Sequence, residues 1–153
     1  MNNINLINKT FKNKVVLVTG HTGFKGTWLI AWLELLGAKV TGISVDIPTN
    51  PSHFVKSKLS KKINDLRFDI KSNNVSKTIK KLKPDFIFHL AAQSLVTKSF
   101  DDPILTWNTN VLGTANVLQS LIKHNKKCVA LFITSDKCYD NKEWEWGYRE
   151  TDQ

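Results

Sequence analysis

The chain has 153 residues, of which 41% are hydrophobic and 23% are charged, and its formal net charge is +9. This length and composition predict one globular domain and argue against a disordered chain. No apolar run reaches the length of a membrane span, and the first residues contain no signal-peptide core, so the sequence predicts a cytoplasmic protein.

The positive charge is carried almost entirely by lysine. Arg67 and Arg149 are the only arginines in the sequence, whereas base readout and bidentate phosphate binding depend on arginine. The lysines are spread over predicted helix faces and loops, so we interpret them as solvated surface and rank a nucleic-acid role last. Cys128 and Cys138 do not make a disulfide framework, and no His or Cys cluster has zinc-site spacing, so we expect no metal.

The first predicted elements are a strand, a tight turn and a helix. Residues 1–13 are rich in Asn and Lys and are expected to be poorly ordered, except that Phe11 can pack against the first strand. Residues 14–19 form a continuous apolar strand, as in the centre of a parallel sheet. Residues 24–36 form a helix that is apolar almost all round, and we interpret its tryptophans, Trp28 and Trp32, as packing residues.

Three glycines, Gly20, Gly23 and Gly26, form the turn between this strand and helix. Gly20 allows a positive φ, Gly23 allows the backbone to approach a pyrophosphate, and Gly26 allows the helix to pack close to the strand. The N–H groups and the positive dipole end of the helix then face the phosphates. The spacing Gly-x-x-Gly-x-x-Gly departs from the commonest dinucleotide fingerprint, so a glycine-rich turn without a ligand is the alternative.

The rest of the chain alternates strands with helices. Further strands are predicted over residues 39–45, 63–68, 85–90 and 128–134, with a loop and a short helical turn over 47–60 and a helix over 72–83. Pro103 opens a long helix that is apolar on two sides, so it needs the sheet and a second partner such as another subunit. Asn is a poor helix former, so we expect one of the three asparagines of this helix to hydrogen-bond the backbone of a neighbouring strand.

Strands that alternate with helices imply a parallel sheet, so we predict an α/β, Rossmann-like doubly wound fold with about five strands. Ligands of such sheets bind at the carboxyl ends of the strands. Asp46 follows the second strand, where an acid accepts the ribose hydroxyls of NAD and repels the 2′-phosphate of NADP. Asp69 is expected either to reach the adenine side of the cofactor or to cap a turn.

The candidate cofactor-binding residues lie in the glycine turn, at the strand ends and in the long helix. They are Gly20, Thr22, Gly23, Phe24, Lys25, Gly26, Asp46, Asp69, Ile70, Leu90, Ala91, Ala92, Gln93, Asn110 and Thr134.

Three polar residues, Ser135, Asp136 and Lys137, stand side by side after the fifth strand. A serine can hydrogen-bond a substrate hydroxyl, a carboxylate can give or take a proton, and a neutral lysine can act as a base. The alternative is a polar turn, and the glycine motif favours the catalytic site. Residues 140–153 alternate aromatic with polar side chains and are expected to form a half-buried extended segment.

Taken together, these motifs resemble the extended short-chain dehydrogenase/reductase superfamily. The resemblance rests on the glycine turn, the strand end at residues 89–93, the helix motif at 108–114 and the polar set after the fifth strand. Two longer runs, residues 20–29 and 134–150, closely resemble the CDP-glucose 4,6-dehydratase family. The similarity extends from Phe11 to the last residue.

The resemblance implies a lyase reaction in which NAD is a transient hydride carrier. Hydride leaves C4 of CDP-glucose, water is lost across C5 and C6, and the hydride returns to C6, which gives CDP-4-keto-6-deoxyglucose. By position, Ser135 binds the C4 hydroxyl and Asp136 protonates the departing C6 hydroxyl. Lys137 stands where dTDP- and GDP-sugar relatives have a glutamate that removes the C5 proton. The implied context is deoxysugar synthesis for surface polysaccharide, and the implied assembly of the full-length protein is a homodimer or larger homo-oligomer.

One motif of the superfamily, the Tyr-x-x-x-Lys pair, does not occur in this sequence: Tyr139 is followed by Glu143, and Tyr148 by Asp152. In the family, the pair and the substrate domain come later in the chain. We therefore expect an N-terminal fragment, with residues 14–153 as an incomplete NAD-binding domain that is inactive alone. The alternatives are another nucleotide-sugar epimerase or dehydratase of the superfamily, or a non-catalytic NAD-binding remnant.

Overall fold

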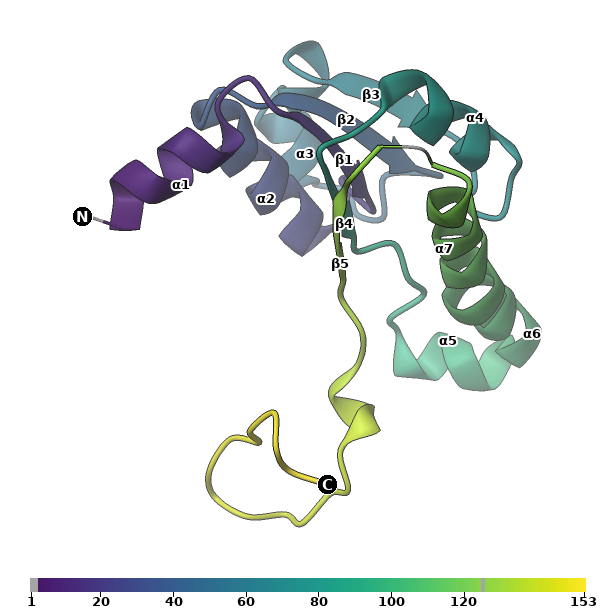
Figure 1. Cartoon of the computed structure of the whole chain (residues 1–153). Coiled ribbons are helices and arrows are strands. Elements are labelled where there is room, and N and C mark those ends of the chain that lie inside the picture. Colours follow the sequence, from purple (N-terminus) through teal and green to yellow (C-terminus); the bar gives the residue numbers. More distant parts are fainter. Residues whose placement is uncertain (1–2, 125) are drawn as a thin grey trace.

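The computed structural model describes residues 3–124 and 126–153, without the side chains of Asn3, Ile4 and Asp136. Its centre is a five-stranded sheet in the order β3-β2-β1-β4-β5, and all neighbouring strands are parallel (Figure 1). The strands are β1 (Val15–Thr19), β2 (Lys39–Ser44), β3 (Asn64–Arg67), β4 (Phe86–His89) and β5 (Val129–Phe132). The predicted doubly wound α/β fold is confirmed, and each strand is slightly shorter than predicted.

Helices cover both faces of this sheet (Figure 1). On one face, α2 (Phe24–Leu35) and α3 (His53–Lys56) pack against Val16 and Val18 of β1. On the other face, α4 (Asn74–Leu82) and α7 (Thr114–Ile122) pack against Leu17, which lies between Val16 and Val18 in β1. Because successive strand residues point to opposite faces, burial on both faces requires the continuous apolar run that the sequence shows.

The N-terminal segment forms a helix, α1 (Asn3–Phe11), where the sequence predicts little order. Ile7 and Phe11 are four residues apart, so they lie on one face of this helix. The Phe11 ring lies 5.0 Å from the Phe86 ring and 6.2 Å from the Phe88 ring, so it packs against β4. The prediction missed the helix because the asparagine-rich composition outweighed this one apolar pair.

The helix that follows the glycine turn, α2, is apolar on two opposite faces, and only one of them is buried. Ile30 and Leu33 are 0% and 1% exposed, whereas Trp28 and Trp32 are 58% and 54% exposed. Neither tryptophan packs against the sheet, because both lie on the face directed away from it, so the interpretation as packing residues is confirmed only for Trp28. Trp28 instead contacts the ring of His53 in α3, with 4.6 Å between ring centroids.

The predicted long helix consists of α6 (Pro103–Trp107), a π-helical turn η2 (Asn108–Gly113) and α7. It begins as predicted at Pro103, and the Asp102 side chain caps it by accepting a hydrogen bond from the backbone N–H of Leu105 at 2.9 Å. A short helix, α5 (Val96–Asp101), precedes it. The loop after β2 contains α3 and a 3₁₀ turn, η1 (Leu59–Lys61), which confirms the predicted helical turn.

The last segment leaves the sheet after β5, passes through a 3₁₀ turn, η3 (Asp136–Cys138), and closes on itself (Figure 1). The backbone N–H of Asp140 donates to the carbonyl of Gln153 at 2.8 Å, and the rings of Tyr139 and Tyr148 stack at 4.9 Å. Trp146 is 67% exposed. The expectation of a half-buried extended segment is wrong, because the aromatic side chains contact one another within a closed loop.

Candidate functional site

The glycine turn between β1 and α2 leaves no space for side chains at two positions. Gly20 has φ +74°, and a Cβ there would lie 2.8 Å from the backbone nitrogen of Ala91. A Cβ on Gly26 would lie 2.1 Å from the carbonyl oxygen of Gly20. The predicted reasons for glycine at these two positions, a positive φ and close helix packing, are confirmed.

Gly23 is the N-cap residue of α2, and no described side chain hydrogen-bonds to cap this helix start. A Cβ on Gly23 would lie 3.4 Å from the nearest atom, the Gly20 carbonyl oxygen, so the fold itself tolerates a side chain here. Phe24 and Lys25 follow as exposed residues. An uncapped helix start behind a flat glycine surface fits the pyrophosphate of a dinucleotide.

His21, inside the turn, is a buried residue that the sequence analysis did not identify. Its Nδ1 lies 3.1 Å from the Ser44 hydroxyl and its Nε2 lies 2.9 Å from the Asp65 carboxylate. Gly42 makes room for it, because a Cβ there would lie 2.3 Å from the imidazole ring. Burial lowers the pKa of His21 although Asp65 opposes the shift, so a neutral ring donates from Nε2 to Asp65 and accepts the Ser44 hydroxyl at Nδ1.

The same carboxylate continues the network to Arg67 at the end of β3. The second oxygen of Asp65 lies 2.9 Å from the Arg67 guanidinium, and the guanidinium also donates to the Asp46 carbonyl at 3.1 Å. The Thr22 hydroxyl donates to that same Asp46 carbonyl at 2.7 Å. The glycine turn, the end of β2 and the end of β3 are thus joined around the backbone of Asp46.

A second buried histidine, His89, joins the ends of β1 and β4 to α7. Its Nδ1 lies 2.7 Å from the Thr19 hydroxyl and its Nε2 lies 3.0 Å from the Thr114 hydroxyl. Thr19 also accepts a hydrogen bond from the backbone N–H of Ala91 at 3.2 Å. Burial lowers the pKa of His89 to about 4, so the ring is neutral at pH 7.

Two asparagines of the long helix hold the loops after β4 and β3. Asn110 accepts from the backbone N–H of Gln93 at 2.7 Å and donates to its carbonyl at 2.9 Å. Asn116 donates to the Ile70 and Ser72 carbonyls at 2.6 and 3.2 Å. Two asparagines of this helix thus bond backbone outside the helix, but their partners lie in the loops after β4 and β3 and not in the strands themselves, so the expected bond to a strand is not found among the described residues.

The other predicted cofactor residues lie where the strand ends place them. The Asp46 side chain is exposed, and Asp69 accepts from the backbone N–H of Lys71 at 2.8 Å, so Asp69 caps a turn. Ile70 is buried against Gly113, where a Cβ would lie 2.5 Å from the Ile70 Cδ1. Leu90, Ala91 and Ala92 follow β4, and Thr134 follows β5.

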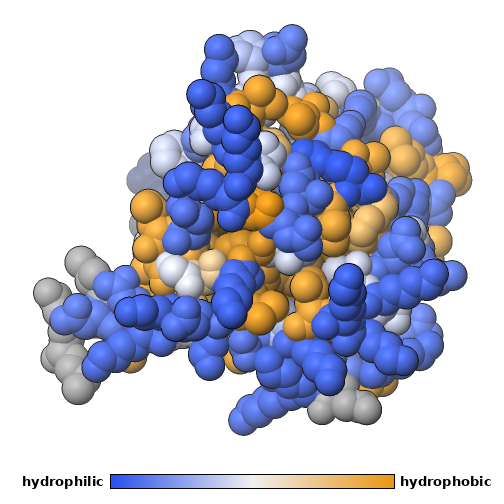
Figure 2. Space-filling model, turned by 90° about the horizontal axis from the view of Figure 1, so that it is seen from above, coloured by the Kyte–Doolittle hydropathy of each residue, from blue (hydrophilic) through white to orange (hydrophobic). Residues whose placement is uncertain are grey.

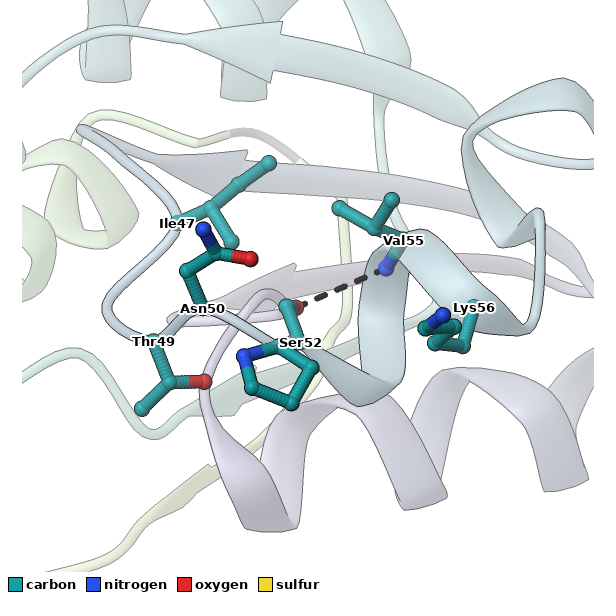
Figure 3. A pocket seen from close by; sticks show the side chains of 7 residues that line it. Ile47, Thr49, Asn50, Ser52, Val55 and Lys56 are labelled. Carbon is teal, nitrogen blue, oxygen red and sulfur yellow. Dashed lines mark hydrogen bonds between the residues drawn. The ribbon is translucent and has the colours of Figure 1, made fainter.

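A pocket of about 380 Å³ lies directly after Asp46, in the connection from β2 to α3 (Figure 3). One of the residues that line this pocket is Ser52, whose hydroxyl caps α3 by accepting a hydrogen bond from the backbone N–H of Val55 at 3.5 Å. The pocket is lined by Ile47, Thr49, Asn50, Pro51, Ser52, Val55 and Lys56.

The predicted catalytic residues follow β5: Ser135 directly precedes η3, and Asp136 and Lys137 lie in it. The backbone N–H of Lys137 donates to the Ser135 hydroxyl at 3.1 Å, so these two residues share one turn. The Asp136 side chain lies outside the described residues. Because β5 is parallel to β4 and β4 to β1, this turn and the glycine turn follow strands that end at the same edge of the sheet.

One face of the molecule is rich in hydrophilic residues (Figure 2). Hydrophilic residues project around the face seen in Figure 2, and hydrophobic residues show between them. Among the described residues, none of the helices has the length and hydropathy to span a membrane.

Known proteins are similar to this chain in sequence and in fold. CDP-glucose 4,6-dehydratase of Salmonella typhimurium is 45% identical over 152 residues, which cover 96% of this chain and 42% of that protein. The structure of epimerase Mth375 from Methanothermobacter thermautotrophicus superposes with a TM-score of 0.81 at 26% identity, over 99% of this chain and 44% of the epimerase. The UDP-glucose 4-epimerase of Thermus thermophilus in complex with NAD has a TM-score of 0.62 at 28% identity, over 72% of this chain and 34% of that structure.

The chain therefore spans less than half the length of each of these proteins. The sequence profile of one family, described as GDP-mannose 4,6 dehydratase, matches residues 17–153, from the middle of β1 to the last residue. The chain belongs to this dehydratase family.

Proposed function

We propose that this chain is the NAD-binding part of a CDP-glucose 4,6-dehydratase and carries part of its catalytic site. The observation that carries the proposal is the 45% identity to the Salmonella enzyme over nearly the whole chain. The product would be CDP-4-keto-6-deoxyglucose, a precursor suited to deoxysugar and polysaccharide synthesis. The cytoplasmic location remains a prediction of the sequence.

The cofactor proposed for the site is NAD. The uncapped start of α2 would face its pyrophosphate and the exposed Asp46 carboxylate its ribose hydroxyls. The loop from Leu90 to Gln93, held by Asn110, would flank the nicotinamide half. When bound, NAD would supply a transient acceptor for the C4 hydride. The NAD complex of the Thermus epimerase supports this choice.

The three residues after β5 would handle the sugar. Ser135 would hydrogen-bond the C4 hydroxyl, Asp136 would protonate the departing C6 hydroxyl, and Lys137 would take the C5 proton. The sequence holds no Tyr-x-x-x-Lys pair to receive the C4 hydroxyl proton. We therefore expect the 153 residues alone to bind NAD without consuming CDP-glucose.

A chimera tests the substrate and the lysine together. Residues 1–153 would replace the matching N-terminal part of the Salmonella enzyme, and CDP-glucose consumption would be followed by anion-exchange chromatography. The proposal predicts an active chimera and a loss of at least about 100-fold in kcat for its Lys137→Met variant, the usual scale of a lost acid–base group. Lys142→Met is the matched control, since Lys142 pairs with Asp140 in the closed terminal loop. A folded chimera without activity would contradict the proposal.

The outer face of the helices from α5 to α7 is proposed as the contact with a second copy of the complete protein. Phe100 of α5 is 81% exposed, and Ile104 and Trp107 of α6 are 69% and 66% exposed. Apolar side chains in such a group mark subunit interfaces. Light scattering on the complete protein should report a dimer or larger assembly that Phe100→Lys dissociates, whereas a monomeric wild type would contradict this proposal.

A further inference from the structure

The network that joins the ends of β2 and β3 contains one cation beside the ribose end of the proposed site. The Arg67 guanidinium lies 3.1 Å from the Asp46 carbonyl oxygen, and its carbon lies 5.3 Å from the centre of the Phe54 ring. The Arg67 side chain is 32% exposed, so solvent reaches it. An arginine near the end of the second strand is the group that accommodates a 2′-phosphate in NADP sites of this fold class.

In this structure Arg67 is already bound by a carboxylate. Asp65 holds the guanidinium through one oxygen at 2.9 Å and holds His21 through the other oxygen at 2.9 Å. Its side chain is only 17% exposed. The histidine cannot turn away, because the Gly42 backbone and Ser44 enclose it, so Asp65 is fixed in the orientation that faces Arg67.

We propose that Asp65 is a specificity-determining residue: by holding the Arg67 guanidinium, it removes the cation that a 2′-phosphate would need, so the site takes NAD and rejects NADP. The proposal rests on the proposed NAD-binding function. Asp46 would then repel the 2′-phosphate directly, and Asp65 would keep the neighbouring arginine from compensating for that repulsion.

Replacing Asp65 by asparagine would release the arginine. The asparagine oxygen would still accept from His21, but its NH₂ group would face the guanidinium, and two donors cannot pair. Arg67 would then be able to turn to a 2′-phosphate. A charge-assisted hydrogen bond of this kind corresponds to a gain of about tenfold in affinity.

The test measures the dissociation constants of NADH and NADPH for the 153-residue chain by fluorescence titration. The proposal predicts that Asp65→Asn raises the affinity for NADPH relative to NADH by about tenfold. Arg67→Gln in the wild type should leave the ratio within about twofold, because the guanidinium is already withheld, and the double variant should return to the wild-type ratio.

Matched controls separate this effect from a general loss of negative charge. Glu34→Gln also releases a cation, Lys62, whose Nζ lies 3.3 Å from the Glu34 carboxylate. Lys56→Gln removes the lysine that lines the pocket after Asp46. Neither variant should change the ratio of the two affinities.

The outcomes are distinct. An unchanged ratio in folded Asp65→Asn, or a tenfold loss of NADPH affinity in Arg67→Gln, would overturn the proposal. If circular dichroism shows that Asp65→Asn is unfolded, the NADPH affinity of Arg67→Gln is the test: a tenfold loss overturns the proposal, and an unchanged affinity supports it. A folded wild type that binds neither cofactor would overturn the proposed function, and this inference with it.

Discussion

At the scale of single residues, the absence of a side chain decides the geometry of the glycine turn. A methyl group on Gly26 would lie 2.1 Å from the Gly20 carbonyl, so α2 would have to move away from β1. We expect Gly26→Ala to lower the free energy of unfolding by about 3 kcal/mol, the upper range for overpacking. Urea unfolding measures this.

Gly147→Ala is the control for that substitution. No atom of the described chain lies within 4 Å of a Cβ built on Gly147. Its unfolding free energy should stay within about 0.5 kcal/mol of the wild type. Equal stability of Gly26→Ala and the wild type would show that the turn is not packed as described.

The buried histidines make stability depend on pH. Burial lowers the pKa of His89 to about 4, below its ordinary value of 6.5, and lowers the pKa of His21 as well. The unfolded chain therefore binds more protons, so stability is complete above pH 6.5 and falls as the pH drops toward 4. His89 alone should contribute a loss of about 3 kcal/mol.

Urea unfolding at pH 7 and at pH 4 checks this expectation. The His89→Gln variant is the comparison, because glutamine does not titrate. It should be less stable at pH 7 and should lose less stability on acidification than the wild type. The same pH dependence in both proteins would assign the effect to other groups.

Residue type alone predicted some of the site. The roles of Gly20 and Gly26 followed from conformational freedom. The poor fit of asparagine inside a helix indicated a bond to backbone elsewhere, but not which asparagines make it or that their partners lie in loops. The cluster of His21, Asp65 and Arg67 could not be predicted, because it joins residues 44 positions apart whose types also occur on any surface. Gly42, a glycine inside an apolar strand, was the available signal of a close approach.

At the scale of elements, the π-helical turn η2 determines where the loop after β4 lies. A π-helical turn changes the direction in which its side chains point, and here it includes Asn110, which makes two hydrogen bonds to the Gln93 backbone. We expect Asn110→Ala to lower the free energy of unfolding by about 2 kcal/mol, because each of the two lost hydrogen bonds contributes about 1 kcal/mol.

Hydrogen exchange gives a local measure of the same contact. The Gln93 amide should lose protection in Asn110→Ala. Asn73→Ala is the control, because Asn73 precedes α4 without capping it through its side chain. Retained protection of Gln93 in Asn110→Ala would mean that the helix does not hold the loop.

Periodicity predicted the existence of the helices better than their orientation. The apolar pattern of the sequence continues from Pro103 through η2 without interruption, so it does not predict the π-helical turn. In α2 both faces are apolar, and the pattern cannot tell which one meets the sheet. The second apolar side of the helix from Pro103 was predicted, whereas the exposure of Trp28 and Trp32 on α2 was found only in the structure.

At the scale of the whole molecule, the sheet order and the parallel direction of all five strands bring the predicted residues to one edge. Alternation of strands and helices predicted the parallel direction of the strands, and the order of the strands came from the structure. The chain spans 42% of the length of its Salmonella relative.

The most direct test of this account is a titration of the folded 153-residue chain with NADH, compared with Gly23→Ala. A side chain at Gly23 fits the fold, with 3.4 Å to its nearest atom, but would meet the pyrophosphate. The account predicts saturable binding that NAD displaces, and a loss of at least about tenfold in affinity for Gly23→Ala at unchanged stability. Absence of NADH binding by the folded wild type, or equal affinity in both proteins, would contradict it.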